Sequence, residues 1–299
     1  MSASVVLITG TSSGIGLATA VAVARAGHRV IATLRNPHND HQKADALRAA
    51  ASAAGVSIDI RPLDVVDAAA IQSCIDGIAA DYGRLDAVIN NAGAGHVGTI
   101  ELESVEAVRT VLETNFFSVV TVTKAAFPHL RTAHGRLITV SSVGGAVGQP
   151  FNEAYCASKF AVEGFMESLT PVAATVGVRV SLVEPGPVST EFVTNIRADA
   201  PAMIAAAGAY APAMLGYLQR TRQQFSSARA QSADAVAAVI VELLAAEAPP
   251  ARVQTSDASS AFVGVKLADL DGSAVQTMTR GWVHQNAPQA TTPTEPVAG

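Results

Sequence analysis

Short runs of β-branched and other apolar residues alternate along this chain with longer segments in which apolar residues recur every three or four positions. The short runs are typical of buried strands, and the longer segments are typical of amphipathic helices. The predicted strands are Val5–Thr9, Arg29–Leu34, Ser57–Leu63, Ala87–Asn90, Leu137–Ser141 and Val178–Val183. The predicted helices are Gly14–Ala26, Gln42–Ala54, Ala68–Tyr82, Val105–Leu130 and, approximately, Ala154–Thr175. This alternation predicts an α/β fold whose parallel sheet is covered by helices on both faces.

The regular alternation loosens beyond Pro185. Residues 195–231 are rich in alanine and contain Pro201, Gly208 and Pro212, a composition that suits a mobile helical lid more than a framework strand. We place this lid at about residues 190–231. Residues 287–299 combine proline with threonine, glutamine and alanine, so we expect a disordered tail there. The sequence therefore predicts a single domain over residues 1–286, with a helical substrate lid and a C-terminal extension.

Composition and charge narrow the possible partners. The chain has 299 residues, 49% of them hydrophobic, and a net charge of −5. Its lysines and arginines are scattered, so the pattern gives no indication of nucleic-acid binding and favours a small-molecule partner. The two cysteines, Cys74 and Cys156, lie outside any disulfide or metal-ligand spacing. They favour free buried thiols, no metal site and a reducing, cytoplasmic location.

The apolar segments are too short for a membrane span. The first, Val5–Ile8, stops at a glycine loop and is typical of a strand rather than a signal peptide. The later run Ala233–Leu244 is interrupted by Asp234 and Glu242 and falls short of the roughly 20 apolar residues that a membrane-spanning helix needs. We therefore expect no integral membrane segment.

A glycine-rich loop joins the first predicted strand to the first predicted helix. Gly10 permits a sharp turn, Gly14 lets backbone N–H groups approach a pyrophosphate, and Gly16 lets the helix pack close to the sheet. The alternative interpretation is a simple tight turn, but the strand–loop–helix context favours a doubly wound, Rossmann-type fold that binds a dinucleotide. The residues expected to bind this cofactor in the loop are Gly10, Ser12, Ser13, Gly14, Ile15 and Gly16.

The end of the second predicted strand indicates which dinucleotide is bound. An acidic side chain there would accept hydrogen bonds from a ribose 2′-hydroxyl and repel a 2′-phosphate. This chain has Leu34 and Arg35 at that point, so a guanidinium is available to pair with phosphate. The pattern favours NADP(H), with NAD(H) as the alternative cofactor and with Arg35 as a solvated surface charge as the alternative interpretation.

Tyr155 and Lys159 are four residues apart on a predicted helix, so they lie on the same face. A phenol with a pKa near 10 transfers protons poorly at neutral pH, and an adjacent positive charge lowers that pKa. Ser142 ends a predicted strand, where its hydroxyl group can point toward the same site. A tyrosine and lysine at this spacing can also be an ordinary helix surface, but the combination with the glycine loop favours acid–base chemistry.

These motifs together resemble the short-chain dehydrogenase/reductase family. The resemblance covers residues 5 to about 192 and includes the following positions, in family order and spacing: the glycine loop, Asp64, Asn90–Gly93, Asn115, Ser142, Tyr155, Lys159 and Pro185–Thr190. The stretch Gly148–Gly164 and the segment Ala32–Arg35 are similar to the branch that contains 17β-hydroxysteroid dehydrogenase type 1 and photoreceptor-type retinol dehydrogenases, whose members prefer NADP(H).

The resemblance implies a role for each matching residue. Tyr155 would be the general acid/base, Lys159 would lower its pKa and hold the nicotinamide ribose, Ser142 would hydrogen-bond the substrate oxygen, and Asn115 would anchor a water in the proton relay. The remaining cofactor-binding residues would be Asp64 and Val65 at the adenine, Asn91, Ala92 and Gly93 at the ribose, and Pro185, Gly186, Val188 and Thr190 on the carboxamide side. The implied reaction is hydride transfer at nicotinamide C4.

The resemblance is weaker where the substrate would bind. We expect Gln149, Phe151, Asn152 and Pro187, together with the lid, to surround an apolar steroid-, retinoid- or oxoacyl-like substrate that has a ketone, aldehyde or alcohol group. Positions where the steroid enzyme offers a histidine and an acid to the far end of estradiol fall near Arg220 and Gly281, which disfavours estradiol itself.

The sequence leaves two alternative functions, and it also predicts an oligomer. A nucleotide-sensing regulator would keep the fold without Tyr155 or Lys159, and both are present. A sugar-nucleotide epimerase or dehydratase shares the fold but usually has a longer substrate domain. We expect a homodimer or homotetramer that pairs through the Val105–Leu130 and Ala154–Thr175 helices, where Ala157, Ala161 and Gly164 allow close approach.

Overall fold

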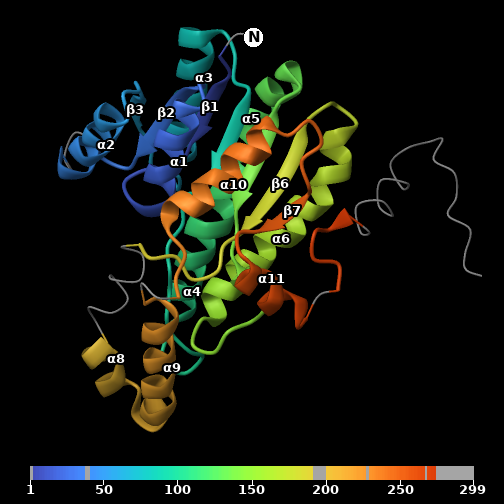
Figure 1. The fold of residues 1–299 in the computed structure, drawn as a ribbon. Coiled ribbons are helices and arrows are strands. Elements are labelled where there is room, and N and C mark those ends of the chain that lie inside the picture. Colours follow the sequence, from blue (N-terminus) through green and yellow to red (C-terminus); the bar gives the residue numbers. More distant parts are fainter. Residues whose placement is uncertain (1–2, 38–40, 191–199, 227–228, 267, 274–299) are drawn as a thin grey trace, which may run out of the picture.

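The computed structural model describes residues 3–37, 41–190, 200–226, 229–266 and 268–273, and it contains one seven-stranded sheet. All neighbouring strands run parallel, in the order β3-β2-β1-β4-β5-β6-β7 (Figure 1). The strands are β1 (Val5–Ile8), β2 (Arg29–Leu34), β3 (Asp59–Pro62), β4 (Ala87–Asn90), β5 (Arg136–Val140), β6 (Arg179–Glu184) and β7 (Arg252–Gln254). The predicted parallel α/β sheet is therefore confirmed.

Helices cover both faces of the sheet. One layer contains α1 (Gly14–Arg25), α2 (His41–Ala53) and α10 (Ala233–Ala245), and the other contains α3 (Ala68–Tyr82), α5 (Ser118–Ala133) and α6 (Glu153–Ala174). Successive residues of β1 serve different layers, because Val6 and Ile8 pack in the cluster of α1 and α10 while Leu7 packs in the cluster of α3 and α5. Burial on both faces explains why the central strands read as continuous apolar runs.

The predicted helix Val105–Leu130 is interrupted in the structure. It consists of α4 (Val105–Leu112), a π-helical turn over Glu113–Phe117, and α5. The wider turn contains Asn115, whose side chain is fully buried and makes hydrogen bonds outside its own helix. The prediction of one regular helix was wrong because the apolar period continues through a turn that a distant contact widens.

Three elements after Pro185 were not assigned from the sequence. These are α10, the edge strand β7, and α11 (Asp257–Gly264). The lid region is helical as expected, with α8 (Ala200–Ala206) and α9 (Ala211–Gln224) at one end of the molecule (Figure 1). The lid residues 191–199 and 227–228 and the tail 287–299 lie outside the described residues.

None of the described helices is long and apolar enough on its own to cross a membrane, although the bent pair Ala200–Ala206 and Gly208–Gln224 passes the length and composition criteria when taken together.

The direction of chain progression changes between β1 and β4. From β1 the chain proceeds through β2 to β3 on one side, and from β4 it proceeds through β5, β6 and β7 on the other. Because all strands are parallel, the loops after β1 and β4 emerge at the same edge of the sheet and diverge there. This edge is the expected location of a ligand site in an open α/β sheet.

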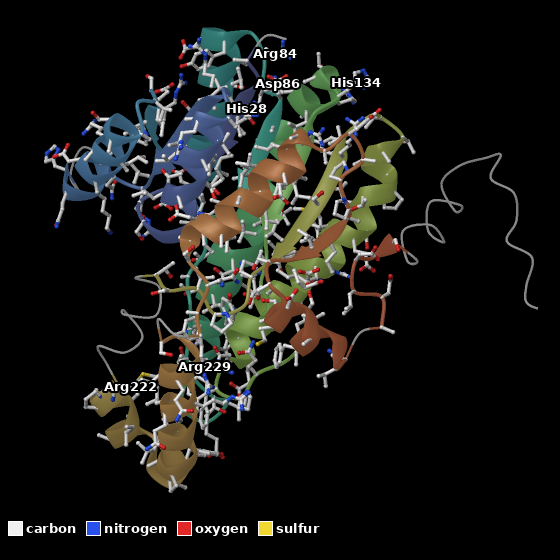
Figure 2. The ribbon with its side chains drawn as sticks, viewed as in Figure 1. His28, Arg84, Asp86, His134, Arg222 and Arg229 are labelled. Carbon is white, nitrogen blue, oxygen red and sulfur yellow. The ribbon has the colours of Figure 1, made fainter. Side chains whose placement is uncertain are left out.

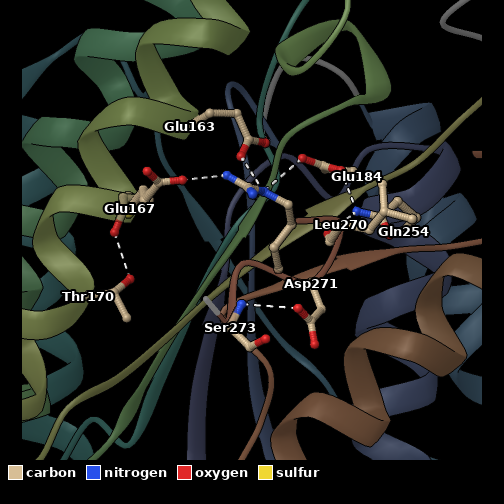
Figure 3. A network of polar contacts seen from close by, with 10 residues as sticks. Glu163, Glu167, Thr170, Glu184, Gln254, Leu270, Asp271 and Ser273 are labelled. Atoms are coloured by element: carbon tan, nitrogen blue, oxygen red, sulfur yellow. Dashed lines mark hydrogen bonds and ion pairs between the residues drawn. The ribbon is translucent and has the colours of Figure 1, made fainter. Parts of the chain in front are cut away.

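A buried ionic network fastens the C-terminal strand to the rest of the sheet. Figure 3 shows Glu163 and Glu167 of α6 and Glu184 of β6 gathered around one guanidinium. This guanidinium belongs to Arg252 of β7, which is 7% exposed and lies 3.3, 2.6 and 3.1 Å from the respective carboxylates. Burial raises the pKa of both Glu163 and Glu184, because desolvation disfavours a charged carboxylate, and the charge of Arg252 opposes this rise.

The network leads to a prediction about stability. Replacing Arg252 with methionine would leave buried carboxylates without their counter-charge, so we expect the free energy of unfolding to fall by about 3–5 kcal/mol. Arg48→Met is the matched control, because Arg48 pairs with Asp45 while both side chains are more than half exposed, and we expect a change below about 1 kcal/mol. Urea denaturation at neutral pH measures both variants. Equal losses in the two variants would show that the network is not stabilising.

Candidate active site

A cavity of about 1560 Å³ opens at the edge of the sheet where the strands end. Nearly all the site residues predicted from the sequence lie in its wall. The predicted residues that line it are Gly10, Ser12, Ser13, Gly14, Ile15, Gly16, Arg35, Val65, Asn91, Ala92, Gly93, Ser142, Gln149, Asn152, Tyr155, Lys159, Pro185, Gly186, Pro187, Val188 and Thr190. Asp64, Asn115 and Phe151 are the predicted site residues that do not line the cavity.

The glycine loop requires a close approach of two backbone segments. Gly10 has a φ of +70°, which favours glycine, and a Cβ atom added to Gly16 would lie 2.1 Å from the carbonyl oxygen of Gly10. Asn91, from the loop after β4, fixes the turn because its Nδ2 donates to the carbonyl oxygens of Thr9 and Gly10, both at 2.9 Å. The loops after β1 and β4 therefore pack together as one rigid unit, which we call the floor of the cavity.

The first turn of α1 has the features of an anion-binding site. Ser13 precedes the helix with extended backbone, its side chain does not cap the helix, and the first turn contains no acidic residue. The first N–H groups of the helix thus remain available, and the positive end of the helix dipole points the same way. Thr190 lies over this loop, with its Cγ2 3.1 Å from the position of a Cβ atom on Gly14. These residues fit the pyrophosphate of a dinucleotide.

Two cations line the cavity beyond the end of β2. The Arg35 side chain is 68% exposed, and its Nε lies 3.7 Å from a carboxylate oxygen of Asp64. Lys43, on α2, lines the same region and was not predicted. The sequence could have indicated Lys43, because this residue follows shortly after the predicted strand whose end is expected to contact the nucleotide ribose. Two cations rather than one are therefore available in the cavity wall to a negatively charged group.

Tyr155 and Ser142 meet in the cavity wall. Ser142 caps a short 3₁₀ turn at Val143–Gly145, with its Oγ accepting from the N–H of Gly144 at 3.0 Å. Burial raises the pKa of Tyr155 to about 12, and a hydrogen bond with Ser142 opposes that rise. The phenol is therefore protonated at neutral pH in this arrangement.

Lys159 is buried one helical turn beyond Tyr155. Its Nζ donates to the carbonyl oxygen of Val140 at 3.0 Å and lies 6.0 Å from the centre of the Tyr155 ring. Burial lowers the pKa of Lys159 to about 8, and the charge of Glu163 opposes this effect. The expectation that Lys159 lowers the pKa of Tyr155 stays a prediction.

Asn115 lies behind the cavity wall. Its Nδ2 donates to the carbonyl oxygen of Ala94 at 2.9 Å and to Oγ of Ser158 at 3.1 Å, and its Oδ1 accepts from the N–H of Ala94 at 2.8 Å. The side chain thus joins the π-helical turn, the loop after β4 and the helix of Tyr155. The proposed role of Asn115 in anchoring a water stays a prediction, since its amide already serves this junction.

Helix α9 of the predicted lid is attached to the cavity next to the start of α6. Asn152, three residues before Tyr155, donates from Nδ2 to the Tyr217 hydroxyl of α9 at 2.7 Å. Phe151 and Tyr217 also pack with their ring centres 5.5 Å apart. Tyr217, Thr221 and Phe225 of the predicted lid line the cavity but were not singled out from the sequence, and Phe262 of α11 was not predicted, because tertiary packing alone brings these side chains here. Arg220 also lines the cavity, whereas Gly281 lies outside the described residues.

Comparisons with known proteins agree with this geometry. A family profile described as short chain dehydrogenase matches residues 4–201. The chain is 38% identical to retinol dehydrogenase 8 of Bos taurus over 90% of its own length and 86% of that protein. It is 35% identical to 17-beta-hydroxysteroid dehydrogenase type 1 of Homo sapiens, over 96% and 88% respectively. A solved short-chain dehydrogenase from Streptomyces avermitilis superposes with a TM-score of 0.73 and 28% identity, covering 94% of this chain and 99% of that structure.

Proposed function

Because the chain belongs to the short-chain dehydrogenase family, we propose that it uses NADP(H) to interconvert a carbonyl and an alcohol on an apolar substrate. It is an NAD(P)-dependent oxidoreductase acting on CH–OH groups, in the branch of retinol dehydrogenase 8 and 17-beta-hydroxysteroid dehydrogenase type 1. One observation supports the proposed reaction most directly. Ser142, Tyr155 and Lys159 line the same cavity as the glycine loop, which is typical of dinucleotide-binding sites.

The cofactor supplies hydride chemistry at nicotinamide C4, and the protein supplies the proton and the orientation. Tyr155 would donate its phenolic proton to the oxygen of the carbonyl during reduction. A phenol whose pKa is about 12 holds its proton at neutral pH, which suits the donor role. Ser142, hydrogen-bonded to Tyr155, would hold the same substrate oxygen.

Lys159 would bind and orient rather than react. Its ammonium group remains largely protonated at neutral pH, since its pKa is about 8. It lies in the cavity wall beside Tyr155, where ribose hydroxyls would be natural acceptors for its N–H groups. In the oxidation direction Tyr155 would have to lose its proton, and an ammonium group turned from Val140 toward the phenol would stabilise the resulting phenolate.

The preference for NADP(H) is supported by charge at the adenosine end. Arg35 and Lys43 line that end of the cavity, and no acidic side chain among the described residues lines it. Two cations can pair with a 2′-phosphate, whereas an unphosphorylated ribose would gain little from them.

The substrate proposal is an apolar compound of the steroid, retinoid or oxoacyl kind. Its support is the large cavity together with relatives whose names refer to retinol and to hydroxysteroids. A screen of ketosteroids, retinal and 3-oxoacyl compounds that follows NADPH absorbance tests it.

We further propose that residues 1–286 act as one domain. We also propose that the protein is cytoplasmic, because its two cysteines are free and buried.

The acid–base role of Tyr155 predicts the behaviour of one variant. Tyr155→Phe should lower turnover by about 100-fold or more, because the transferable proton is lost while the ring still packs, and cofactor affinity should change little. Tyr82→Phe makes the same chemical change at a hydroxyl that hydrogen-bonds Asp59 away from the cavity, and it should retain activity. Steady-state kinetics measures both variants. Turnover of Tyr155→Phe within about tenfold of the parent would exclude this assignment.

The cofactor proposal predicts a change of preference. NADPH should bind at least about tenfold tighter than NADH, and this advantage should shrink as salt rises. Arg35→Ala should weaken NADPH and leave NADH nearly unchanged. Leu34→Asp should reverse the order, because it adds a ribose acceptor and a charge that repels the phosphate.

Fluorescence titration measures these affinities, with Arg48→Ala as control because this exposed arginine of α2 does not line the cavity. Equal parental affinities for the two cofactors, or equal losses for both in Arg35→Ala, would contradict the phosphate site.

The proposed assembly predicts a dimer or tetramer. The helices expected to pair carry large apolar side chains that stay exposed, namely Phe117 beside α5 and Phe160 and Val172 on α6. Light scattering at micromolar concentration should therefore give a mass of two or four chains, and Phe160→Glu should shift it toward one chain. A monomer in the parent protein would contradict the proposal.

A further inference from the structure

Among the described residues, all the charged side chains that line the cavity are cations. They are Arg35, Lys43, Lys159, Arg220 and Arg229, and no aspartate or glutamate of the described residues reaches the wall. This is unexpected in a chain that has 25 acidic and 20 basic residues. A cleft lined by charges of one sign concentrates ligands of the other sign, so the cavity favours anions along its length.

Three of these cations are accounted for by the proposed cofactor. Arg35 and Lys43 lie at the adenosine end, and Lys159 lies beside Tyr155 where the nicotinamide ribose would bind. Arg220 and Arg229 come from α9 and from the segment that follows it. Two cations on the lid side therefore remain without an assigned ligand.

The inward face of α9 presents Arg220 to the substrate side. Tyr217, Arg220, Thr221 and Gln224 follow helical spacing, and all four line the cavity. Tyr217 accepts a hydrogen bond from Asn152 at 2.7 Å, which places this face opposite the start of the helix that carries Tyr155. A substrate whose carbonyl reaches Tyr155 would extend toward this face.

Neither lid arginine is neutralised by a residue whose position the structure describes. Within the described part of the chain, no carboxylate forms an ion pair with Arg220 or with Arg229. Figure 2 shows Arg229 and Arg222 where the lid joins the rest of the molecule, and Arg222, unlike Arg229, does not line the large cavity. Both cavity-lining guanidinium groups are exposed and open to a ligand.

We infer that the substrate carries an oxyanion at the end remote from its carbonyl, and that Arg220 and Arg229 bind this oxyanion. The inference rests on the proposed function, because it assigns the lid side of the cavity to the substrate. Guanidinium groups recognise carboxylates, sulfates and phosphates through paired hydrogen bonds, so the three anions share this chemistry. The substrate class is then an amphipathic carbonyl compound, apolar in its body and anionic at its far end.

A phosphate of the cofactor is the competing ligand for Arg229. Two residues further along the chain, the N–H of Gln231 donates to the carbonyl oxygen of Pro187 at 3.0 Å, in the loop that would hold the carboxamide. The experiment must therefore separate loss of substrate binding from loss of cofactor binding.

Two pairs of carbonyl compounds test the inference, since the members of each pair differ in the anion alone. Dodecanal is compared with 12-oxododecanoate, and estrone with estrone 3-sulfate, by following NADPH oxidation. The parent should favour the anionic member of at least one pair by about tenfold or more in kcat/KM, and the pair that shows the effect distinguishes a carboxylate from a sulfate. Arg220→Gln and Arg229→Gln should each remove most of this advantage and leave the neutral member unchanged.

Arg222→Gln is the matched control, because it removes the same charge from α9 outside the cavity and should change neither member. Equal rates for the neutral and anionic members in the parent would overturn the inference while leaving the oxidoreductase function intact. A loss of NADPH affinity in Arg220→Gln and Arg229→Gln, without selective loss of the anionic substrates, would also overturn it and assign both residues to the cofactor.

A binding measurement keeps the inference independent of turnover. In calorimetric titrations of the protein with NADPH bound, where neither ligand can react, dodecanoate should bind about tenfold tighter than dodecanol, and Arg220→Gln should abolish the difference. Equal affinities would overturn the inference whether or not any aldehyde is reduced. Tight dodecanoate binding without reduction of any carbonyl compound would instead contradict the proposed function and leave the anion site standing.

Discussion

The parallel direction of all seven strands is the constraint on which the site depends. It brings the loops after β1, β4, β5 and β6 to one edge of the sheet, although these loops are far apart in the sequence. The edge is then made rigid by close backbone contact, since Gly16 leaves no room for a side chain against Gly10 and Asn91 bonds both sides of the junction. Each chemical group of the cavity is positioned relative to this floor.

Helix α6 connects the cavity to the buried ionic cluster around Arg252. Toward the cavity it presents Lys159 beside Tyr155, in a wall without carboxylates among the described residues. On the same face and one turn further along the helix, Glu163 belongs to the buried cluster around Arg252. The charge of Glu163 helps to keep the neighbouring ammonium protonated despite burial. The C-terminal strand, which carries Arg252, thereby supports both the position of α6 and the electrostatics of the site.

Local patterns made much of the site predictable. The glycine loop and the pair Tyr155 and Lys159 are readable because a turn and a helix fix their geometry over a few residues. The π-helical turn at Asn115 was not predictable, since it depends on contacts with Ala94 and Ser158 from other segments. β7 and the inward face of α9 were missed for the same reason, as their positions are set by pairing with β6 and by packing on Phe151.

The most direct test of the central claim follows the hydride itself. The enzyme is incubated with NADPH that carries deuterium at both C4 positions of the nicotinamide and with a panel of ketosteroids, retinal and 3-oxoacyl thioesters, and the alcohols are analysed by mass spectrometry. The account predicts an alcohol that has one deuterium at the former carbonyl carbon, with its hydroxyl proton drawn from the protein and solvent. Alcohol without that deuterium, or no reduction of any member of the panel, would contradict it.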